Sequence, residues 1–150
     1  MSDHLTDLTT RLQRLEDLQA INQLFIDYGR HLDAGDFDSY AELFADDGEV
    51  LLGPLGRAIG RKAIRELMTT MLAGKVGESL HIVTSPIVNL TGDTATSSVM
   101  WTVMHRAAGG EPVVTMVGRH EDALVRERGQ WKIQRRRGFV DMPSNFRPRS

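Results

Sequence analysis

The sequence predicts an α+β domain in which long antiparallel strands curl around helices packed on their concave side. Two observations support this fold class. Over most of the first half of the chain, apolar residues recur at three- and four-residue steps, as helices require. From Leu80 onward the chain is rich in β-branched and aromatic residues, with turn signals between the runs. The length of 150 residues fits one domain spanning 1–150.

A stripe of apolar residues at helical spacing predicts the first helical segment. Its members are Leu5, Leu8, Leu12, Leu15, Ile21, Leu24, Phe25, Tyr28 and Leu32. The stripe drifts near Glu16 and Asp17, so we expect either a kink there or a short helix followed by a longer one. Gly35 is expected to end this segment, because glycine is the usual residue after a helix.

Two more helices are expected before the strands begin. Asp36 should cap a short helix over 37–45, which the Asp46-Asp47-Gly48 turn would end. A short strand is expected at 49–52. The segment 61–74 reads as a third helix, with apolar residues on one side.

Four long strands are predicted at 79–90, 94–106, 112–127 and 130–140. Turn signals at Gly92-Asp93, Gly109-Gly110 and Arg128-Gly129 separate them. Pro86 lies inside the first of these strands. Since proline has no N–H for the ladder, we expect a bulge or a sheet edge there.

Composition excludes several classes of protein. The net charge of −2, with both signs interspersed, argues against a nucleic-acid binder. The absence of cysteine excludes disulfides, thiolate zinc sites and cysteine nucleophiles. The N-terminal region is too charged for a signal peptide, and no apolar run is long enough to span a membrane. We therefore expect a cytoplasmic protein with neither nucleic acid nor membrane as partner.

Asp33 and His81 are the first candidates for chemistry. Asp33 lies at the carbonyl end of the first helix, where the helix dipole disfavours a carboxylate by about 0.3–1 kcal/mol unless a partner offsets it. His81 lies near the start of a strand. Taken singly, each residue fits a structural role. As a pair, the carboxylate would hold one imidazole nitrogen and leave the other free as a general base.

Tyr28 lies on the apolar stripe and is either a core residue or a hydrogen-bond donor at a pocket. An ideal helix separates Tyr28 from Asp33 by about 140°, so both reach one pocket only if the last helical turn unwinds. His31 shares the face of Tyr28 better and is a rival candidate.

The last strand and its neighbours supply further candidates. Arg136 must point away from Arg135 and Arg137, so at least one arginine is expected to be partly buried and paired, where it could stabilise developing negative charge. Trp101 shares a strand face with Val103 and with Val99 and His105, while Met100 and Met104 share the other. One face should line a pocket and the other should pack on a partner subunit. No histidine pair has the local spacing of a metal site, so no metal is expected.

Several motifs in order resemble one known family. They are Tyr28-x4-Asp33-x-Gly35-Asp36, AELFADDGEV, GRKAI at 60–64, His81 opening a long strand, Gly92-Asp93-x-Ala95, and Trp131-Lys132-Ile133 leading to Arg136. Together, over about 15–141, they resemble the SnoaL-like polyketide cyclase and dehydratase branch of the nuclear transport factor 2-like superfamily. The resemblance implies a cone-shaped α+β barrel, with a strongly curved, mostly antiparallel sheet wrapped around three N-terminal helices and a deep apolar pocket.

The same resemblance implies a function. Asp33 and His81 match the aspartate–histidine pair of scytalone dehydratase, bile acid 7α-dehydratase and hexachlorocyclohexane dehydrochlorinase. Tyr28 matches a tyrosine of the two dehydratases, and Arg136 matches an arginine of the dehydrochlorinase that assists the leaving group. The expected protein is a cofactor-independent lyase that acts on an apolar cyclic molecule. Its expected catalytic residues are Tyr28, Asp33, His81 and Arg136.

The substrate is expected to contact four residues, namely Phe25, Trp101, Val103 and His105. The bile-acid enzyme has a carboxylate where this chain has Met104 and His105, and either residue could face the pocket. An isomerase, a polyketide cyclase, a hydrophobic-ligand carrier and a dioxygenase small subunit are the alternatives. A homo-oligomer, either dimer or trimer, is expected.

Overall fold

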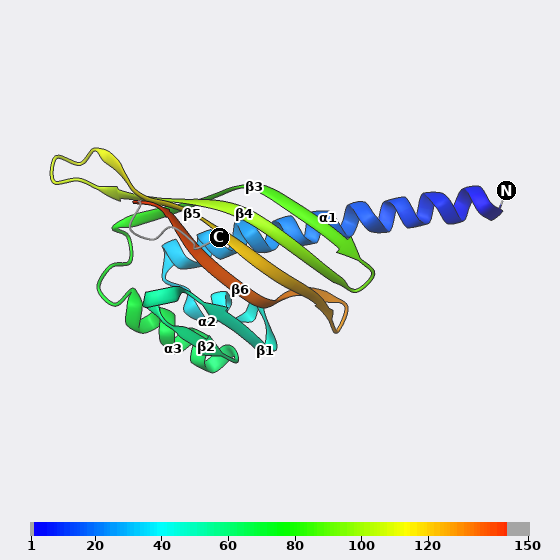
Figure 1. Ribbon diagram of the computed structural model, residues 1–150, viewed down its shortest axis with the longest axis horizontal. Helices are drawn as coiled ribbons and strands as arrows, with labels where there is room; N and C mark the ends of the chain where they lie inside the picture. Colours follow the sequence, from blue (N-terminus) through cyan, green and yellow to red (C-terminus); the bar gives the residue numbers. More distant parts are fainter. Residues whose placement is uncertain (1, 144–150) are drawn as a thin grey trace.

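The computed structural model describes residues 2–143, and its centre is one six-stranded sheet (Figure 1). The strands are β1 (Phe44–Leu51), β2 (Arg57–Ile59), β3 (Ser79–Thr91), β4 (Thr94–Arg106), β5 (Pro112–Glu127) and β6 (Gln130–Met142). Their order in the sheet is β2-β1-β6-β5-β4-β3. All neighbours are antiparallel except β1 and β6, which are parallel.

Three helices pack against the curved sheet: α1 (Ser2–Ala34), α2 (Phe37–Glu42) and α3 (Arg61–Met71). A single 3₁₀ turn, η1 (Gly53–Leu55), precedes β2. The predicted α+β cone is confirmed, and the four long strands lie within two residues of their expected ends. No helix among residues 2–143 has the length and apolar character needed to cross a membrane.

The expected break in α1 near Glu16 and Asp17 is wrong, because one continuous helix runs from Ser2 to Ala34. The drift of the apolar stripe has another cause. Residues 2–16 are all exposed, whereas Ile21, Phe25 and Leu32 are buried against the sheet. The two halves of the helix therefore turn their apolar residues in different directions without any bend.

The predicted end of α2 is also wrong. Asp36 caps the helix as expected, since its carboxylate accepts a hydrogen bond from the Ser39 N–H at 3.0 Å. The helix ends at Glu42, and strand β1 begins at Phe44, where the sequence predicted continued helix. Phe44 is completely buried and pairs with Ile133 of β6, so a distant strand decides where this helix stops.

Pro86 lies on an edge strand, at an irregularity in the β3–β4 register between Thr84 and Ile87. Both features that the sequence suggested for this proline are therefore present. Ser85, just before it, has a φ of 55°. The irregularity separates the half of β3 that faces the site from the half beyond it.

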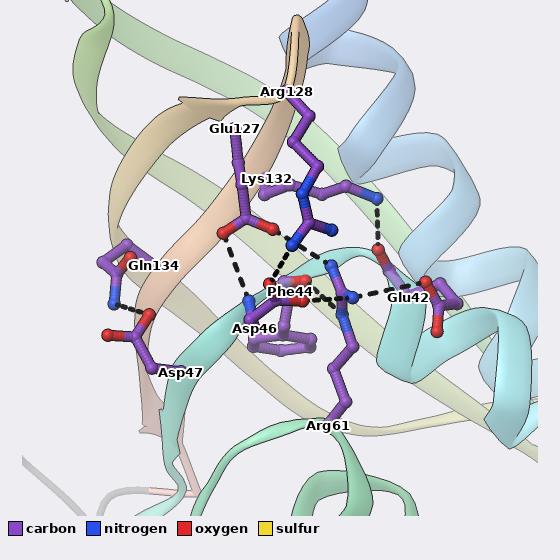
Figure 2. Close-up of polar contacts among 9 residues, drawn as sticks. All are labelled: Glu42, Phe44, Asp46, Asp47, Arg61, Glu127, Arg128, Lys132 and Gln134. Carbon is purple, nitrogen blue, oxygen red and sulfur yellow. Dashed lines mark hydrogen bonds and ion pairs between the residues drawn. The ribbon is translucent and has the colours of Figure 1, made fainter.

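A polar network fixes the start of α3 (Figure 2). The Arg61 guanidinium donates to the Phe44 carbonyl oxygen at 2.9 Å and to the Asp46 carboxylate at 2.6 Å. Asp46 also pairs with Arg128 at 2.7 Å, and its N–H donates to Glu127 at 3.2 Å. These contacts join α3 to β1 and to the β5–β6 turn, so they set the position of the helix that covers the site.

Candidate active site

A cavity of about 290 Å³ lies between α1, α3 and the inner face of the sheet. Helix α3 supplies Met68 and Met71, and the sheet supplies Val83, Trp101 and Val103. Most of the wall is therefore apolar. A few polar side chains interrupt it, which is the usual make-up of a small-molecule site.

Asp33 and His81 are in direct contact at the edge of this cavity. The Asp33 Oδ1 lies 2.7 Å from the His81 Nδ1, and both side chains are about one fifth exposed. The two carboxylate oxygens also accept the His81 backbone N–H, at 3.0 and 3.1 Å. These contacts offset the unfavourable position of a carboxylate at a helix carboxyl end. They also orient the ring, because an ionised carboxylate can only accept hydrogen bonds.

Gly29 makes this contact possible. A Cβ at position 29 would lie 3.0 Å from the carbonyl oxygen of His81, tighter than an ordinary van der Waals contact. The glycine therefore lets the backbone of α1 pass close to β3. Asp33, one turn further along α1, is thereby brought within reach of the imidazole.

Tyr28 and His81 both line the cavity, whereas Asp33 lies outside the cavity lining, behind His81. This arrangement removes the difficulty of the 140° separation on the helix, because Tyr28 and Asp33 need not reach one point. His31, the rival candidate, does not line the cavity. Its Nδ1 lies 4.0 Å from the Asp36 carboxylate instead.

Arg136 is buried and paired, as expected, and it is absent from the cavity lining. The side chain is completely buried, and its Nε and Nη2 donate to Asp122 at 2.7 and 2.8 Å. Burial by itself would lower the pKa of Arg136, but the Asp122 carboxylate raises it above the ordinary value. The guanidinium carbon lies 4.2 Å from the centre of the Tyr28 ring, so Arg136 makes a cation–π contact with a residue of the cavity wall.

Phe25 is placed elsewhere than predicted. It is 2% exposed, belongs to the core and is absent from the cavity lining. Trp101, Val103 and His105 do line the cavity, and His105 rather than Met104 turns toward it. The His105 Nδ1 lies 2.7 Å from the Thr115 hydroxyl oxygen.

Gly118 creates the space for Trp101. The two residues are opposite each other on β4 and β5. A Cβ at position 118 would overlap both the Trp101 ring and the Phe139 carbonyl oxygen. The indole therefore occupies the place of the missing side chain and forms part of the cavity wall.

His120 is a functional candidate that the sequence analysis did not single out. It is 5% exposed and lines the cavity, with its ring centre 5.1 Å from that of Tyr28 and 5.8 Å from that of Trp101. Its Nδ1 is buried with no hydrogen-bond partner among the described residues. Burial lowers the pKa of His120 well below its ordinary value, and Arg136 and His81 lower it further. The ring is therefore neutral at pH 7.

A sequence signal for His120 existed in the alternation of β5. Strand alternation puts positions 118, 120, 122 and 124 on one face, opposite the charged Arg119 and Glu121, and the structure buries these four positions. Leu124 marks that face as the inner one. Among residues 2–143, no three histidine or carboxylate side chains come together in a way that could hold a metal ion.

Comparisons with known proteins agree on one family. A model of the SnoaL-like domain matches residues 13–137. A solved nuclear transport factor 2-like protein with a cystatin-like fold, from Novosphingobium aromaticivorans, is 29% identical, covers 94% of this chain and 92% of its own, and superposes with a TM-score of 0.87. A proposed scytalone dehydratase from the same organism is 25% identical over 91% of this chain and 92% of its own, with a TM-score of 0.73. A hexachlorocyclohexane dehydrochlorinase, 20% identical over 93% of both chains, shares the fold with a TM-score of 0.78.

Proposed function

This chain belongs to the SnoaL-like family, and we propose that it is a cofactor-independent lyase that acts on a small, apolar cyclic molecule. The observation that carries the proposal is the Asp33–His81 pair, joined at 2.7 Å beside an apolar cavity. Similarity to a proposed scytalone dehydratase supports elimination as the reaction.

His81 would be the general base. Since the Asp33 carboxylate accepts the Nδ1–H, the other ring nitrogen, Nε2, carries the lone pair. His81 lines the cavity, so this lone pair would meet a C–H bond of a bound molecule. A positioned base of this kind contributes about 10²–10⁴-fold to the rate.

Tyr28 and His120 would bind an oxygen of the substrate. A neutral imidazole has one N–H and one lone pair, and a buried N–H without a partner is rarer than a buried lone pair without one. Because the Nδ1 of His120 has no partner in the described part of the chain, we assign its hydrogen to Nε2. The Tyr28 hydroxyl and this Nε2–H would then donate to the same substrate oxygen, as in an oxyanion hole.

The proposed elimination proceeds with these groups alone. His81 takes a proton from the carbon beside a carbonyl, and the electrons of that C–H bond move toward the oxygen held by Tyr28 and His120. As the C=C bond forms, the bond to the leaving hydroxyl breaks. The protonated His81 returns its proton to that hydroxyl, and water departs.

An isomerase is the second candidate, because the same donors would stabilise an enolate whose carbon is then reprotonated elsewhere. The mass of the product distinguishes the two reactions, since elimination loses water and isomerisation loses nothing.

Exchange of substrate hydrogen tests the shared first step. Small cyclic ketones and their β-hydroxy derivatives are incubated with the protein in D₂O, and deuterium uptake and loss of water are followed by mass spectrometry. His81→Gln should lower the exchange rate about 10²–10⁴-fold. His31→Gln is the matched control, since His31 lies outside the cavity, and it should exchange at the wild-type rate. Wild-type exchange by His81→Gln would overturn the proposal.

A further inference from the structure

The first half of α1 carries a row of leucines that nothing in the described chain covers. Leu5, Leu8, Leu12 and Leu15 are 67%, 54%, 57% and 64% exposed. Figure 1 shows this part of the helix extending alone beyond the end of the sheet. Most helical stability in proteins comes from the packing of an apolar face, and this part of α1 has no such packing within the described chain.

The leucine row does not continue the buried face of α1. At 3.6 residues per turn, the row lies about 160° around the helix from Ile21, Tyr28 and Leu32, which face the core. α1 is one continuous helix from Ser2 to Ala34, and Figure 1 shows no sharp kink in it, so the row stays turned away from its own sheet. Within residues 2–143, no element of the same chain covers this face.

The spacing of the row identifies the kind of occupant. Steps of three, four and three residues place Leu5 and Leu12 at position a, and Leu8 and Leu15 at position d, of two heptads. A stripe of this width fits the seam of a coiled coil better than the broader apolar face of a helix that packs on a globular core. The same row on a second helix complements it.

Charge sets the direction of the pair. In this register Arg11 is at position g and Glu16 at the following position e, and both are exposed. In a parallel pair these two positions of opposite charge lie across the seam from each other. An antiparallel pair in the same register would place Arg11 against the partner's Arg11. The contact of Arg11 with Asp7 in its own helix is 3.7 Å long and exposed, so it competes weakly.

We propose that two copies of this chain pair through residues 2–16 of α1 as a parallel two-stranded coiled coil. The coiled coil ends where α1 begins to pack against its own sheet, so the sheets of the two copies lie at the same end of the assembly. Each cavity is built by its own chain, and the pairing is independent of the proposed reaction.

The mass of the protein in solution tests the pairing. Sedimentation equilibrium of the full chain should give at least twice the 16.7 kDa of one copy, and the mass should fall on dilution. The double variant Leu8→Glu/Leu12→Glu should halve the mass. The matched control, Thr6→Glu/Thr10→Glu, adds the same charges to the opposite side of the same helix and should keep the wild-type mass.

Charge reversal tests the parallel direction. Arg11→Glu alone and Glu16→Arg alone should each weaken the association, and the double reversal should restore it. Near-ultraviolet circular dichroism of the two tryptophans verifies that every variant keeps its folded body. A monomeric wild type at high concentration, or equal masses for the leucine variant and its control, would overturn the pairing. Failure of the double reversal to restore association would overturn the parallel direction.

Discussion

Replacing Asp33 with asparagine should move the hydrogen of His81 from Nδ1 to Nε2 and so abolish the proposed base. In the wild type, Asp33 accepts two hydrogen bonds from His81, one from the ring and one from the backbone N–H. Asparagine retains one acceptor oxygen, which can keep the backbone contact. Its amide nitrogen is a donor and then faces Nδ1, which must supply a lone pair.

The magnitude follows from the contact that is lost. A hydrogen bond to a charged partner contributes about 1.5–3 kcal/mol, which corresponds to a change of about 10- to 150-fold in the tautomer ratio. With Nε2 protonated, the nitrogen at the cavity cannot accept a proton. We therefore expect deuterium exchange of a ketone substrate to fall by about 10- to 150-fold, in proportion to the tautomer with a free Nε2.

Long-range ¹H–¹⁵N correlation spectra of the histidine rings measure the tautomer directly and need no substrate. The His81→Gln variant assigns the resonances of His81. Asp36→Asn is the matched control, because asparagine caps a helix about as well as aspartate and Asp36 does not contact His81. If Asp33→Asn leaves Nε2 of His81 unprotonated, or leaves exchange at the wild-type rate, the proposed role of Asp33 is refuted.

Three predictions concern stability, measured by urea denaturation. Arg136→Met should lower the free energy of unfolding by about 3–5 kcal/mol, because the Asp122 charge stays buried without its partner. Adding Asp122→Leu should recover much of that loss. An equal loss in the single and the double variant would contradict this explanation. Gly118→Ala should lower the free energy of unfolding by about 1–3 kcal/mol or more, since the new methyl group overlaps a backbone oxygen of β6. An unchanged urea midpoint would contradict this steric role. Hydrogen bonds from Arg126 lower the pKa of Asp17 from 3.8 to about 2, so this pair stabilises the fold above about pH 4 and loses its effect as the pH falls toward 2. Asp17→Asn should therefore lower the free energy of unfolding by about 1–3 kcal/mol at pH 7, and by progressively less below pH 4. If wild type and variant differed by the same amount at pH 7 and near pH 2, titration of Asp17 would not explain the effect.

The long strands were predictable because their signals are local. Side-chain alternation marks each strand, and glycines with positive φ, such as Gly92, Gly110 and Gly129, mark each turn. The end of α2 was not predictable in this way. Parallel pairing of Phe44 with Ile133, far along the chain, decides that end, and no local pattern reports it.

The same distinction between local signals and long-range packing applies to the residues of the candidate site. Helical spacing puts Tyr28 on the apolar stripe, and strand alternation puts Trp101 and His105 on one common face. Which strand face is the inner one came only from the structure, which finds all three residues at the cavity. Helical spacing and strand alternation also indicate that Phe25 and one arginine of the last strand are buried, but they do not say how far the cavity extends. Phe25 and Arg136 are buried in the core and are absent from the cavity lining.

The sequence by itself determined the α+β class, the inward faces of the strands and the pairing of Asp33 with His81, the last through its resemblance to a family. Only the tertiary structure decided which inward residues meet. The register of β4, β5 and β6 sets Asp122 beside Arg136 and places His120 two residues away on the same face. Register depends on backbone hydrogen bonds between strands distant in sequence, and a slip of one residue would turn each of these side chains to the opposite face. The pairing of strands therefore puts Arg136 beside Asp122 in the core and His120 in the cavity wall.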